Sequence, residues 1–448
     1  MSNLLDKASV ILTPTAYNNG EALCVKPSDG SGDFDFSRNS AATRVNAQGL
    51  VENVQILSSN LVQNGDFSEE GVQEVSNGSF SQEGAEEVTN GSFDTDSDWV
   101  KGTGWSISGG KANFNGTSNN NLQQNNVTEQ NKIYKVSFEV SDYVSGTVQV
   151  IIGDNLAGED FTFSSNGVFV FYTTADSGTT QIVRFRPTTS AEFSIDNVSV
   201  REVGQDWNVG SDWSIAENKA VSSGSGNNLQ QTINISSNKT YKLTFDVIST
   251  SGTLAFDLGG STAKTLTDSG SKEYYFQRVN NNNLRFYGGN YYGEITNISV
   301  KEVLQDWSVA DYGAVSPSAV ITPNTEGVKL EKTVSADWRS SFLVQPISYT
   351  NGSQYKVTFK LKNGNLPSGG SVFVRRAYDS SSQSIVNNLT LTNDWVEYTY
   401  YFVADSNSED ISFGEVNWQN AGVGQYFYID DVTLIEITDD TNLPRINY

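Results

Sequence analysis

A short pattern of alternating residues occurs three times in this chain and limits the folds that it can adopt. The copies read Tyr-Lys-Val-Ser-Phe-Glu-Val from Tyr134, Tyr-Lys-Leu-Thr-Phe-Asp-Val from Tyr241 and Tyr-Lys-Val-Thr-Phe-Lys-Leu from Tyr355. Apolar residues at every second position predict a half-buried strand, because successive side chains of a strand point to opposite faces of its sheet. Three phenylalanines are expected at equivalent inward positions: Phe138, Phe245 and Phe359.

Further matches surround these strands and delimit three modules. A Trp-Ser-Ile element starts at Trp105 and Trp213, and a Gln-Asp-Trp element ends at Trp207 and Trp307. Turn residues between short strands, without helical periodicity, predict tandem all-β sandwiches. The predicted parts are an N-terminal segment (1–59), short repeats (60–93), three modules (94–203, 205–303 and 305–437) and a C-terminal segment (438–448). Joints of one residue, Gly204 and Leu304, predict that neighbouring modules pack against each other.

A smaller repeat of 13 residues precedes the first module. Asn-Gly-Asp-Phe starts at Asn64, and Asn-Gly-Ser-Phe starts at Asn77 and at Asn90. We interpret these segments as copies of a strand that opens a module. We expect that only the last copy closes a domain.

The composition excludes several function classes. A net charge of −24 repels nucleic acids and anionic membranes, so we expect neither nucleic-acid partners nor membrane insertion. The chain has no histidine, which removes Ser-His-Asp and Cys-His catalysis and disfavours a zinc site. Cys24 is the only cysteine, so the chain cannot form an internal disulfide. Neutral glycans, cations and other proteins remain compatible partners.

The module pattern resembles the jelly-roll carbohydrate-binding modules appended to bacterial glycanases. It combines the Asn-Gly-Ser-Phe segment, tryptophan-rich early strands and a closing strand that contains Asp196 in the first module and Asp430 and Asp431 in the third. The resemblance implies a two-sheet jelly roll, with a structural calcium ion between the opening and closing segments. The second module has Thr296 and Asn297 in the closing strand, which argues against an ion there.

The N-terminal segment resembles the opening segment of fibre-like structural proteins of tailed bacteriophages. Three stretches carry the resemblance, Ala8–Tyr17, Val25–Asp33 and Phe36–Glu52, and Leu443–Tyr448 matches an element that usually follows them closely. The resemblance implies that the jelly rolls are inserted within one virion-attachment domain, and that Leu443–Tyr448 return to the N-terminal segment. It also implies a location in the virion, further C-terminal sequence in relatives, other virion proteins as partners and a homo-oligomer. A trimer is compatible with this reading, although no heptad repeat specifies one.

Aromatic residues in loops are the candidates for glycan binding, because sugar C–H groups stack on flat rings. Tryptophans at equivalent positions of the repeats, such as Trp105 and Trp213, are instead expected in the cores. The second module contains a loop rich in Gly and Asn, and loops commonly carry binding residues. The candidates are Tyr287, Tyr291 and Tyr292 in that loop, and Trp338 and Trp418 in the third module.

Acidic residues near the module ends are the candidates for a metal site, because calcium prefers carboxylate and carbonyl oxygens. Alternating acids resemble the first half of an EF-hand, but Trp99 occupies the sixth position, where that loop needs glycine. A solvated acidic turn is the alternative, so no cofactor is required, and calcium is the expected ion if one is bound. The candidate ligands are Asp94, Asp96, Asp98 and Asp196 in the first module and Asp430 and Asp431 in the third.

Three functions remain open. The first is a structural protein of a bacteriophage virion, a head or tail fibre or decoration component, that contacts host glycans or receptors. The second is a bacterial extracellular glycan-binding protein, and the third is the accessory-module part of a glycanase. The first ten residues lack the apolar stretch of an export signal, which favours the virion protein. We expect no catalysis, because no motif selects the pair of carboxylates that a glycosidase needs.

Overall fold

The computed structural model describes short strands within residues 11–57 and most of residues 58–439. Residues 117–119, 154–160, 176–180, 189, 225, 238, 312–318, 325–326, 333–340, 368–370, 379–380 and 416–422 are not described. No helix in the described part of the chain is long and apolar enough to cross a membrane. The strands before residue 58 are β1 (Ile11–Leu12), β2 (Glu21–Ala22), β3 (Cys24–Lys26), β4 (Phe34–Asp35), β5 (Thr43–Val45), β6 (Val51–Asn53) and β7 (Gln55–Leu57).

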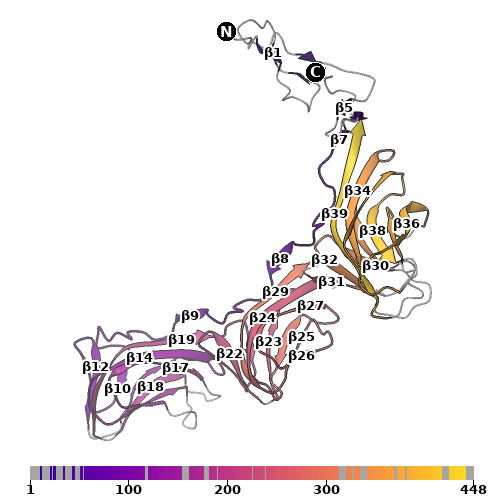
Figure 1. The fold of residues 1–448 in the computed structure, drawn as a ribbon. Helices are drawn as coiled ribbons and strands as arrows, with labels where there is room; N and C mark the ends of the chain where they lie inside the picture. The colour runs from indigo at the N-terminus through magenta and orange to yellow at the C-terminus, as the bar shows by residue number, and fades with distance from the viewer. Residues whose placement is uncertain are drawn as a thin grey trace, which may run out of the picture. The chain divides into compact units, whose positions relative to one another are not determined.

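The first module pairs a five-stranded sheet with a six-stranded sheet (Figure 1). The five-stranded sheet has the order β10 (Val100–Lys101), β13 (Leu122–Asn125), β18 (Ile182–Pro187), β15 (Val148–Ile152) and β16 (Phe161–Phe163). The six-stranded sheet has the order β11 (Trp105–Ser108), β12 (Lys111–Gly116), β19 (Ala191–Val203), β14 (Ile133–Ser145) and β17 (Gly167–Thr174), and β9 (Glu83–Glu86) pairs with β19.

The second module repeats this topology strand by strand. Its five-stranded sheet has the order β20 (Asn208–Val209), β23 (Asn228–Thr232), β28 (Asn283–Tyr287), β25 (Leu254–Leu258) and β26 (Lys264–Leu266). Its six-stranded sheet has the order β21 (Trp213–Ala216), β22 (Lys219–Ser223), β29 (Tyr292–Val303), β24 (Thr240–Ser251) and β27 (Gly270–Gln277), and β8 (Glu70–Gln73) pairs with β29.

The third module has the same two sheets. The five-stranded sheet has the order β30 (Ser308–Asp311), β33 (Ser341–Pro346), β38 (Asp410–Glu415), β35 (Ser371–Arg375) and β36 (Ser384–Thr390). The six-stranded sheet has the order β31 (Ala319–Asn324), β32 (Gly327–Lys332), β39 (Tyr426–Asp439), β34 (Gln354–Asn363) and β37 (Val396–Val403), and β7 pairs with β39. A 3-10 turn (Ser381–Gln383) precedes β36. The predicted fold, three tandem all-β jelly-roll sandwiches, is confirmed.

The chain divides into two compact units. One unit comprises Met1–Glu69 and Leu304–Tyr448 and contains the third module, and the other comprises Glu70–Val303 and contains the first two. The chain therefore passes between the units twice. Within the second unit, Ile133 and Val203 of the first module belong to the buried apolar cluster of the second module. The packing that we predicted across the joint at Gly204 is therefore present.

Equivalent aromatic residues fill the three cores. Phe138, Phe245 and Phe359 are each at most 1 % exposed, which confirms that they point inward. Each ring meets a phenylalanine of the facing sheet edge-on, with ring centroids 5.1 to 5.2 Å apart, in an arrangement that aromatic pairs favour. The tryptophans predicted for the cores are also buried: Trp105, Trp207, Trp213 and Trp307.

The three Asn-Gly-x-Phe segments each complete a different module, in reverse order along the chain. We call residues 55–67, 70–80 and 83–93 clips 1, 2 and 3. Clip 1 lies on the third module, clip 2 on the second and clip 3 on the first, where β7, β8 and β9 run along β39, β29 and β19 (Figure 1). The expectation that only the last copy closes a domain is wrong, because every closing strand accepts a clip along its free edge.

The same hydrogen bonds hold each clip. In each module, the side chain of a buried glutamine contacts the residue that precedes the clip asparagine. The glutamine Oε1 accepts a hydrogen bond from the N–H of that residue, and its Nε2 donates one to the C=O, at 2.8 to 2.9 Å. The asparagine C=O accepts the indole N–H of a buried tryptophan at 3.1 Å. The clip phenylalanine packs against that indole, with ring centroids 5.1 to 5.2 Å apart. The glutamines are Gln124, Gln231 and Gln345, and the tryptophans are Trp99, Trp207 and Trp307.

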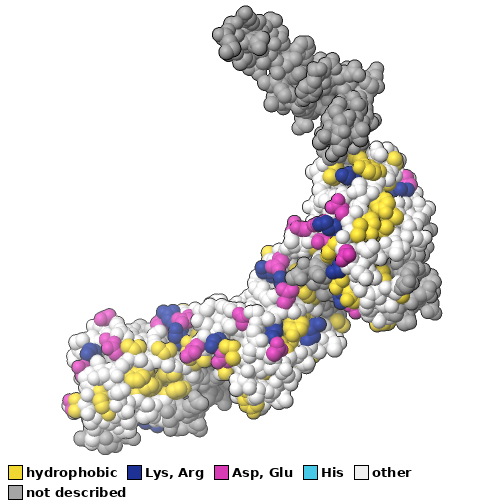
Figure 2. Space-filling view, in the orientation of Figure 1, with side chains coloured by type: hydrophobic (Ala, Val, Ile, Leu, Met, Phe, Trp, Pro, Cys, Tyr) yellow, Lys and Arg dark blue, Asp and Glu magenta, His cyan; other side chains and the backbone are white. Residues whose placement is uncertain are grey.

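Ion pairs also stabilise the contacts of clips 2 and 3 with their modules. Glu70 of clip 2 pairs with Lys242 at 2.7 Å and with Lys301 at 2.9 Å. Glu83 of clip 3 pairs with Lys135 at 2.6 Å. Figure 2 shows basic and acidic side chains next to each other along β8 and β9. These exposed pairs contribute less to stability than the buried amide contacts, because solvent screens them.

The clip glycine permits the closest approach of the two backbones. A Cβ added at Gly65, Gly78 or Gly91 would lie 2.0 Å from a carbonyl oxygen of the closing strand. The C=O of each glycine also accepts a hydrogen bond of 2.9 Å from that strand. No residue with a side chain fits at these positions without moving the clip.

Substitution Gly78→Ala is expected to lower the free energy of unfolding of the second module by about 1–3 kcal/mol, the usual cost of forcing an extra methyl group into a packed site. Gly226→Ala is the matched control, because a Cβ there meets no atom within 4 Å. The control is expected to stay within about 0.5 kcal/mol of the parent protein. Urea unfolding followed by tryptophan fluorescence measures both, and equal midpoints for the two variants would contradict the role of the clip glycine.

Candidate functional site

The structure separates the three tyrosines that were predicted to bind glycans. Tyr291 is 0 % exposed, its ring lies 6.3 Å from that of Trp213, and its hydroxyl donates to the C=O of Ile248. The prediction for Tyr291 is wrong, because a buried ring offers no face to a ligand. Tyr292 is 47 % exposed and lies over Gly224, where an added Cβ would come within 2.2 Å of its ring.

Tyr287 lies at the end of β28, on the outer face of the five-stranded sheet of the second module. It is half-buried, and burial raises the pKa of its hydroxyl above the usual range. Its neighbours across the sheet are Asn228 on β23 and Ala255 on β25. The ring is therefore partly exposed on this face, between a polar neighbour and a small apolar one.

A charged pair lies beside the Tyr287 ring. Arg285 donates from Nε to Oδ1 of Asp257 at 2.9 Å and from Nη2 to the other carboxylate oxygen. Its guanidinium carbon lies 5.6 Å from the Tyr287 ring centroid, and Gln230 lies opposite Arg285 on the neighbouring strand. The hydrogen bonds to Asp257 raise the pKa of the Arg285 guanidinium. We name these residues, together with Asn228, the Tyr287 face.

The Tyr287 face combines an aromatic ring with donors and acceptors on a rigid sheet. Two amides and the guanidinium can hydrogen-bond ligand hydroxyls, the buried Asp257 carboxylate holds the guanidinium in place, and the ring supports an apolar ligand surface. The sequence contains a signal for this arrangement, because Arg285 and Tyr287 are two residues apart in one strand and so share a face. The contributions of Asn228, Gln230 and Asp257 depend on strand pairing that the sequence alone does not give.

The other two modules present different chemistry on the corresponding sheet. In the first module, Arg184 and Arg186 occupy the positions of Arg285 and Tyr287. In the third, Ser412 and Gly414 occupy them, and Phe342, opposite Gly414, is 0 % exposed and lies 4.9 Å from the Arg375 guanidinium carbon. The candidates Trp338 and Trp418 lie outside the described residues. Within the described part of the chain, the Tyr287 face is therefore particular to the second module.

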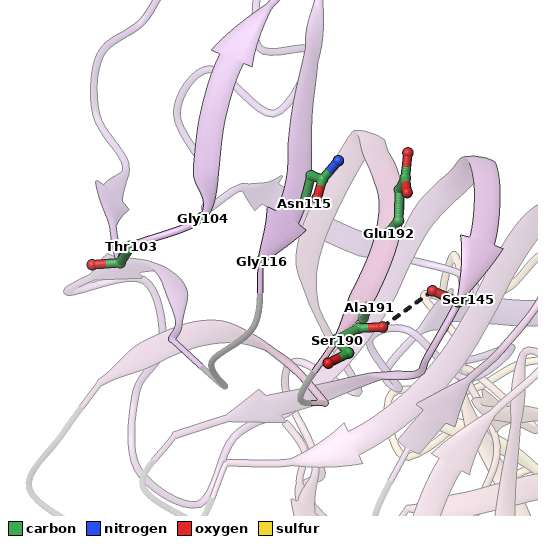
Figure 3. A pocket seen from close by; sticks show the side chains of 8 residues that line it. All are labelled: Thr103, Gly104, Asn115, Gly116, Ser145, Ser190, Ala191 and Glu192. Carbon is green, nitrogen blue, oxygen red and sulfur yellow. Dashed lines mark hydrogen bonds between the residues drawn. The ribbon is translucent and has the colours of Figure 1, made fainter.

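A hollow of about 370 Å³ lies in the first module (Figure 3). Glu192 on β19 lies between its cross-strand partners Asn115 on β12 and Ser145 on β14. The Ser145 hydroxyl donates to the Ser190 C=O at 3.1 Å. The lining combines polar and apolar surface, and its members are Thr103, Gly104, Asn115, Gly116, Ser145, Ser190, Ala191 and Glu192.

The acidic residues proposed as calcium ligands in the first module are engaged with other groups. Asp94 accepts a hydrogen bond from Ser92 at 2.7 Å, Asp98 accepts one from Ser97 at 2.5 Å, and Asp96 pairs with Lys101. Asp196 accepts the N–H of Asn197 at 2.6 Å. The described residues contain no group of three or more His, Cys, Asp or Glu side chains placed to hold a metal ion.

The acidic residues of the third module lie beside clip 1. Burial raises the pKa of the Asp430 carboxyl, and the nearby Asp431 and Asp66 carboxylates raise it further. Asp431 forms an ion pair of 2.6 Å with Lys360. Asp66 stands where clips 2 and 3 have serine, so only clip 1 brings a carboxylate to this place. Calcium binding stays a prediction for both modules.

Comparisons with known proteins assign no family. The chain matches no family profile and no curated protein. A tandem pair of CBM22 domains from Paenibacillus barcinonensis is 10 % identical, with 79 % of this chain and 97 % of that chain covered and a TM-score of 0.23. Sulfolobus Turreted Icosahedral Virus supplies a chain that is 11 % identical, with coverages of 76 % and 89 % and a TM-score of 0.17. Tandem CBM51 modules of a family 98 glycoside hydrolase from Streptococcus pneumoniae are 7 % identical, with coverages of 85 % and 99 % and a TM-score of 0.18.

Thermal unfolding with millimolar calcium and with a chelator tests the ion prediction. An ion that binds only the folded state at 100 times its Kd raises the free energy of unfolding by about 2.7 kcal/mol. Asp430→Asn is expected to remove this increase if the ion lies in the third module, and Asp196→Asn if it lies in the first. Identical melting curves for the parent protein under the two conditions would dismiss both sites.

Proposed function

We propose that this chain is a non-enzymatic structural protein of a bacteriophage virion, whose jelly-roll modules contact host-surface glycans or a glycan-bearing receptor. The observation that carries the glycan contact is the Tyr287 face. It offers one accessible ring beside fixed hydrogen-bonding groups, which is the combination that a sugar needs. A location in the virion, other virion proteins as partners and a homo-oligomer, with a trimer as one form, are parts of the same proposal.

The charges of the Tyr287 face favour a neutral glycan. Arg285 is already paired with the buried Asp257 carboxylate, so its positive charge is compensated and is not available to bind an anionic sugar. The chain as a whole carries a net charge of −24, which repels anionic polysaccharides at long range. Hydroxyl groups of a neutral sugar can still use the free donors and acceptors of Asn228 and Gln230.

The path of the chain supports attachment through its two terminal segments. β7 pairs with β39, with Leu57 opposite Ile437 and Gln55 opposite Asp439. The N-terminal segment therefore leads into the third module beside the place where the C-terminal segment leaves it. This neighbourhood agrees with a single attachment domain into which the modules are inserted. Residues 443–448, which were predicted to return to the N-terminal segment, lie outside the described residues.

Substitution Tyr287→Ala is expected to weaken glycan binding by at least about tenfold, equivalent to about 1.4 kcal/mol, because it removes the stacking surface. Arg285→Ala should also weaken binding, because it leaves Asp257 without its partner. Tyr275→Ala is the matched control, since Tyr275 lies in the same module but on β27 of the other sheet. An array of neutral oligosaccharides probed with the full chain provides the measurement. Equal binding by all three variants, or no binding by the parent chain, would reject the glycan contact.

Deletion of residues 1–53 is expected to abolish incorporation into purified phage particles while the modules stay folded. Mass spectrometry of particles measures incorporation, and a strand-type circular dichroism spectrum checks folding. The full-length chain is the positive control and should be found in particles. A truncated chain that enters particles at the full-length level would contradict attachment through this segment. Absence of the full-length chain from particles, together with glycan binding, would favour the bacterial glycan-binding protein or the glycanase accessory part.

A further inference from the structure

The first module packs against the second through the end at which its closing strand finishes. Ile133 and Val203 lie opposite each other on the outer face of the six-stranded sheet, and both belong to the apolar cluster of the second module. Tyr172 packs against the same cluster, and β21 contacts both β14 and β17. Ile215 of β21 is 1 % exposed, whereas its equivalent Ile107 in the first module is half-buried. Apolar residues at this end of a module therefore form a surface that the next part of the fold covers.

The third module presents apolar side chains at the equivalent end. Tyr401 of β37 corresponds to Tyr172, because each lies opposite a lysine of the central strand, Lys356 or Lys135. Val403 follows two residues later and so shares the face of Tyr401. Tyr401 is 56 % exposed and Val403 is 55 % exposed. The position that the second module covers on the first is thus open on the described part of the third.

The closing strand of the third module adds to this apolar surface. Ile435 is half-buried and lies opposite Lys356, where the first module has Arg201 and the second has Lys301. Arg201 and Lys301 pair with clip glutamates, for which clip 1 has Leu57. An ionic row has become an apolar one, and contiguous exposed apolar residues are typical of an interaction surface. We name these residues the Tyr401 patch: Tyr401, Val403 and Ile435.

The N-terminal segment joins the third module at this same end, and both belong to one compact unit. β7 pairs with the end of β39, with Gln55 opposite Asp439, so the chain before β7 enters from that end. β6 ends at Asn53, and β5 and β6 form a two-stranded antiparallel ribbon with Val45 opposite Val51. Such a ribbon is at best marginally stable in water by itself. The ribbon needs a surface to pack on, and the Tyr401 patch needs a cover.

We infer that the β5–β6 ribbon docks on the Tyr401 patch, as the antiparallel β21–β22 ribbon of the second module covers the equivalent end of the first. Side-chain contacts then fix the N-terminal segment to the third module, in addition to the backbone pairing of β7. This docking requires neither glycan binding nor a location in the virion. The inference therefore goes beyond the proposed function and does not depend on it.

The length of the ribbon is sufficient for this contact. β39 and β34 lie between β7 and β37, so three strand spacings, about 14 Å, separate the start of clip 1 from Tyr401. The five residues from Asn53 back to Gln48 extend up to about 17 Å at roughly 3.3 Å per residue. The part of the chain that can reach the patch contains three apolar residues: Val45, Leu50 and Val51.

A second copy of the chain is the alternative occupant, because β37 is an edge strand that can pair with another chain. The covalent connection favours the ribbon. Val54 alone separates β6 from β7, and a short link of this kind gives an effective concentration on the order of millimolar. A second copy would have to compete with that concentration.

Trypsin cleavage after Arg44 of β5 measures docking in the full chain. Tyr401→Thr combined with Val403→Thr removes the apolar surface and keeps β-branched residues in β37. Cleavage at Arg44 is expected to be at least about fivefold faster in this variant than in the parent protein, because proteolysis follows the population of the undocked ribbon. Val168→Thr combined with Val170→Thr is the matched control, since both valines are exposed on edge strand β17 of the first module. The control should be cleaved at the parent rate.

Hydroxyl-radical footprinting of Tyr401 provides a second measurement that leaves the sequence of the third module unchanged. Val45→Asp combined with Val51→Asp alters the apolar face of the ribbon, and Tyr401 oxidation is expected to become at least about threefold faster as the ribbon undocks. Arg44→Ser combined with Glu52→Ser is the matched control, because this pair lies on the other face of the same ribbon. The control should be oxidised at Tyr401 as the parent protein is.

Equal Arg44 cleavage in the parent protein and in the variant of Tyr401 and Val403 would overturn the docking. Equal Tyr401 oxidation in the parent protein and in the variant of Val45 and Val51 would do the same. Protection of Tyr401 that rises with protein concentration and persists in the latter variant would show that a second copy covers the patch, which also overturns the inference. Failure of the chain to bind glycans or to enter particles would reject the proposed function and leave the docking standing.

Discussion

One buried glutamine in each module satisfies both backbone groups of a residue that is distant in the sequence, and the three sandwiches depend on this pair of hydrogen bonds. Without it, the N–H and C=O of the residue before the clip asparagine would be buried without partners, at a cost of roughly 1–3 kcal/mol for each group. The tryptophan indole and the clip glycine complete the same joint each time. Because the contacts that hold the clip are the same in all three modules, the residues on the outer sheet surfaces can differ without loss of the fold. Arg184 and Arg186 of the first module occupy the positions of Arg285 and Tyr287 of the second, where the third module has Ser412 and Gly414.

Charged residues around the clips help each clip to pair with the closing strand of its own module. Glu70 and Glu83 reach basic residues of the second and first modules, whereas β7 has Leu57 at the corresponding position, opposite Ile437 of the third. Clip 1 on the second module would remove Glu70 from both Lys242 and Lys301. Each such pair is weak on its own, but specificity requires only a difference between the correct and incorrect arrangements. Three nearly identical joints can thus form within one chain with the correct partners.

The sequence predicts the strands better than it predicts their long-range partners. Strict alternation around Phe138 is a local signal, and its repetition at Phe245 and Phe359 identifies the modules. Gln63 and Gln345 are 282 residues apart, and no sequence pattern near either residue indicates their contact. The module that each clip contacts therefore could not be predicted from the sequence. Alternation also shows that Tyr291 and Tyr292 face opposite ways, but it does not show which one is buried.

Because the clips follow each other in the reverse order of their modules, each clip waits a different time during synthesis for its partner strands. Clip 3 meets Gln124 after only 35 further residues, whereas clip 1 waits for Gln345, 282 residues later. At about 5–20 residues per second, that wait lasts roughly 15–55 s. Clip 1 is therefore the first clip to emerge from the ribosome and the last to pair with its module. A chain that terminates before the third module is complete keeps an unused strand with Phe67 exposed. Such a strand is a ready substrate for chaperones and proteases, which gives the cell a means to recognise incomplete copies.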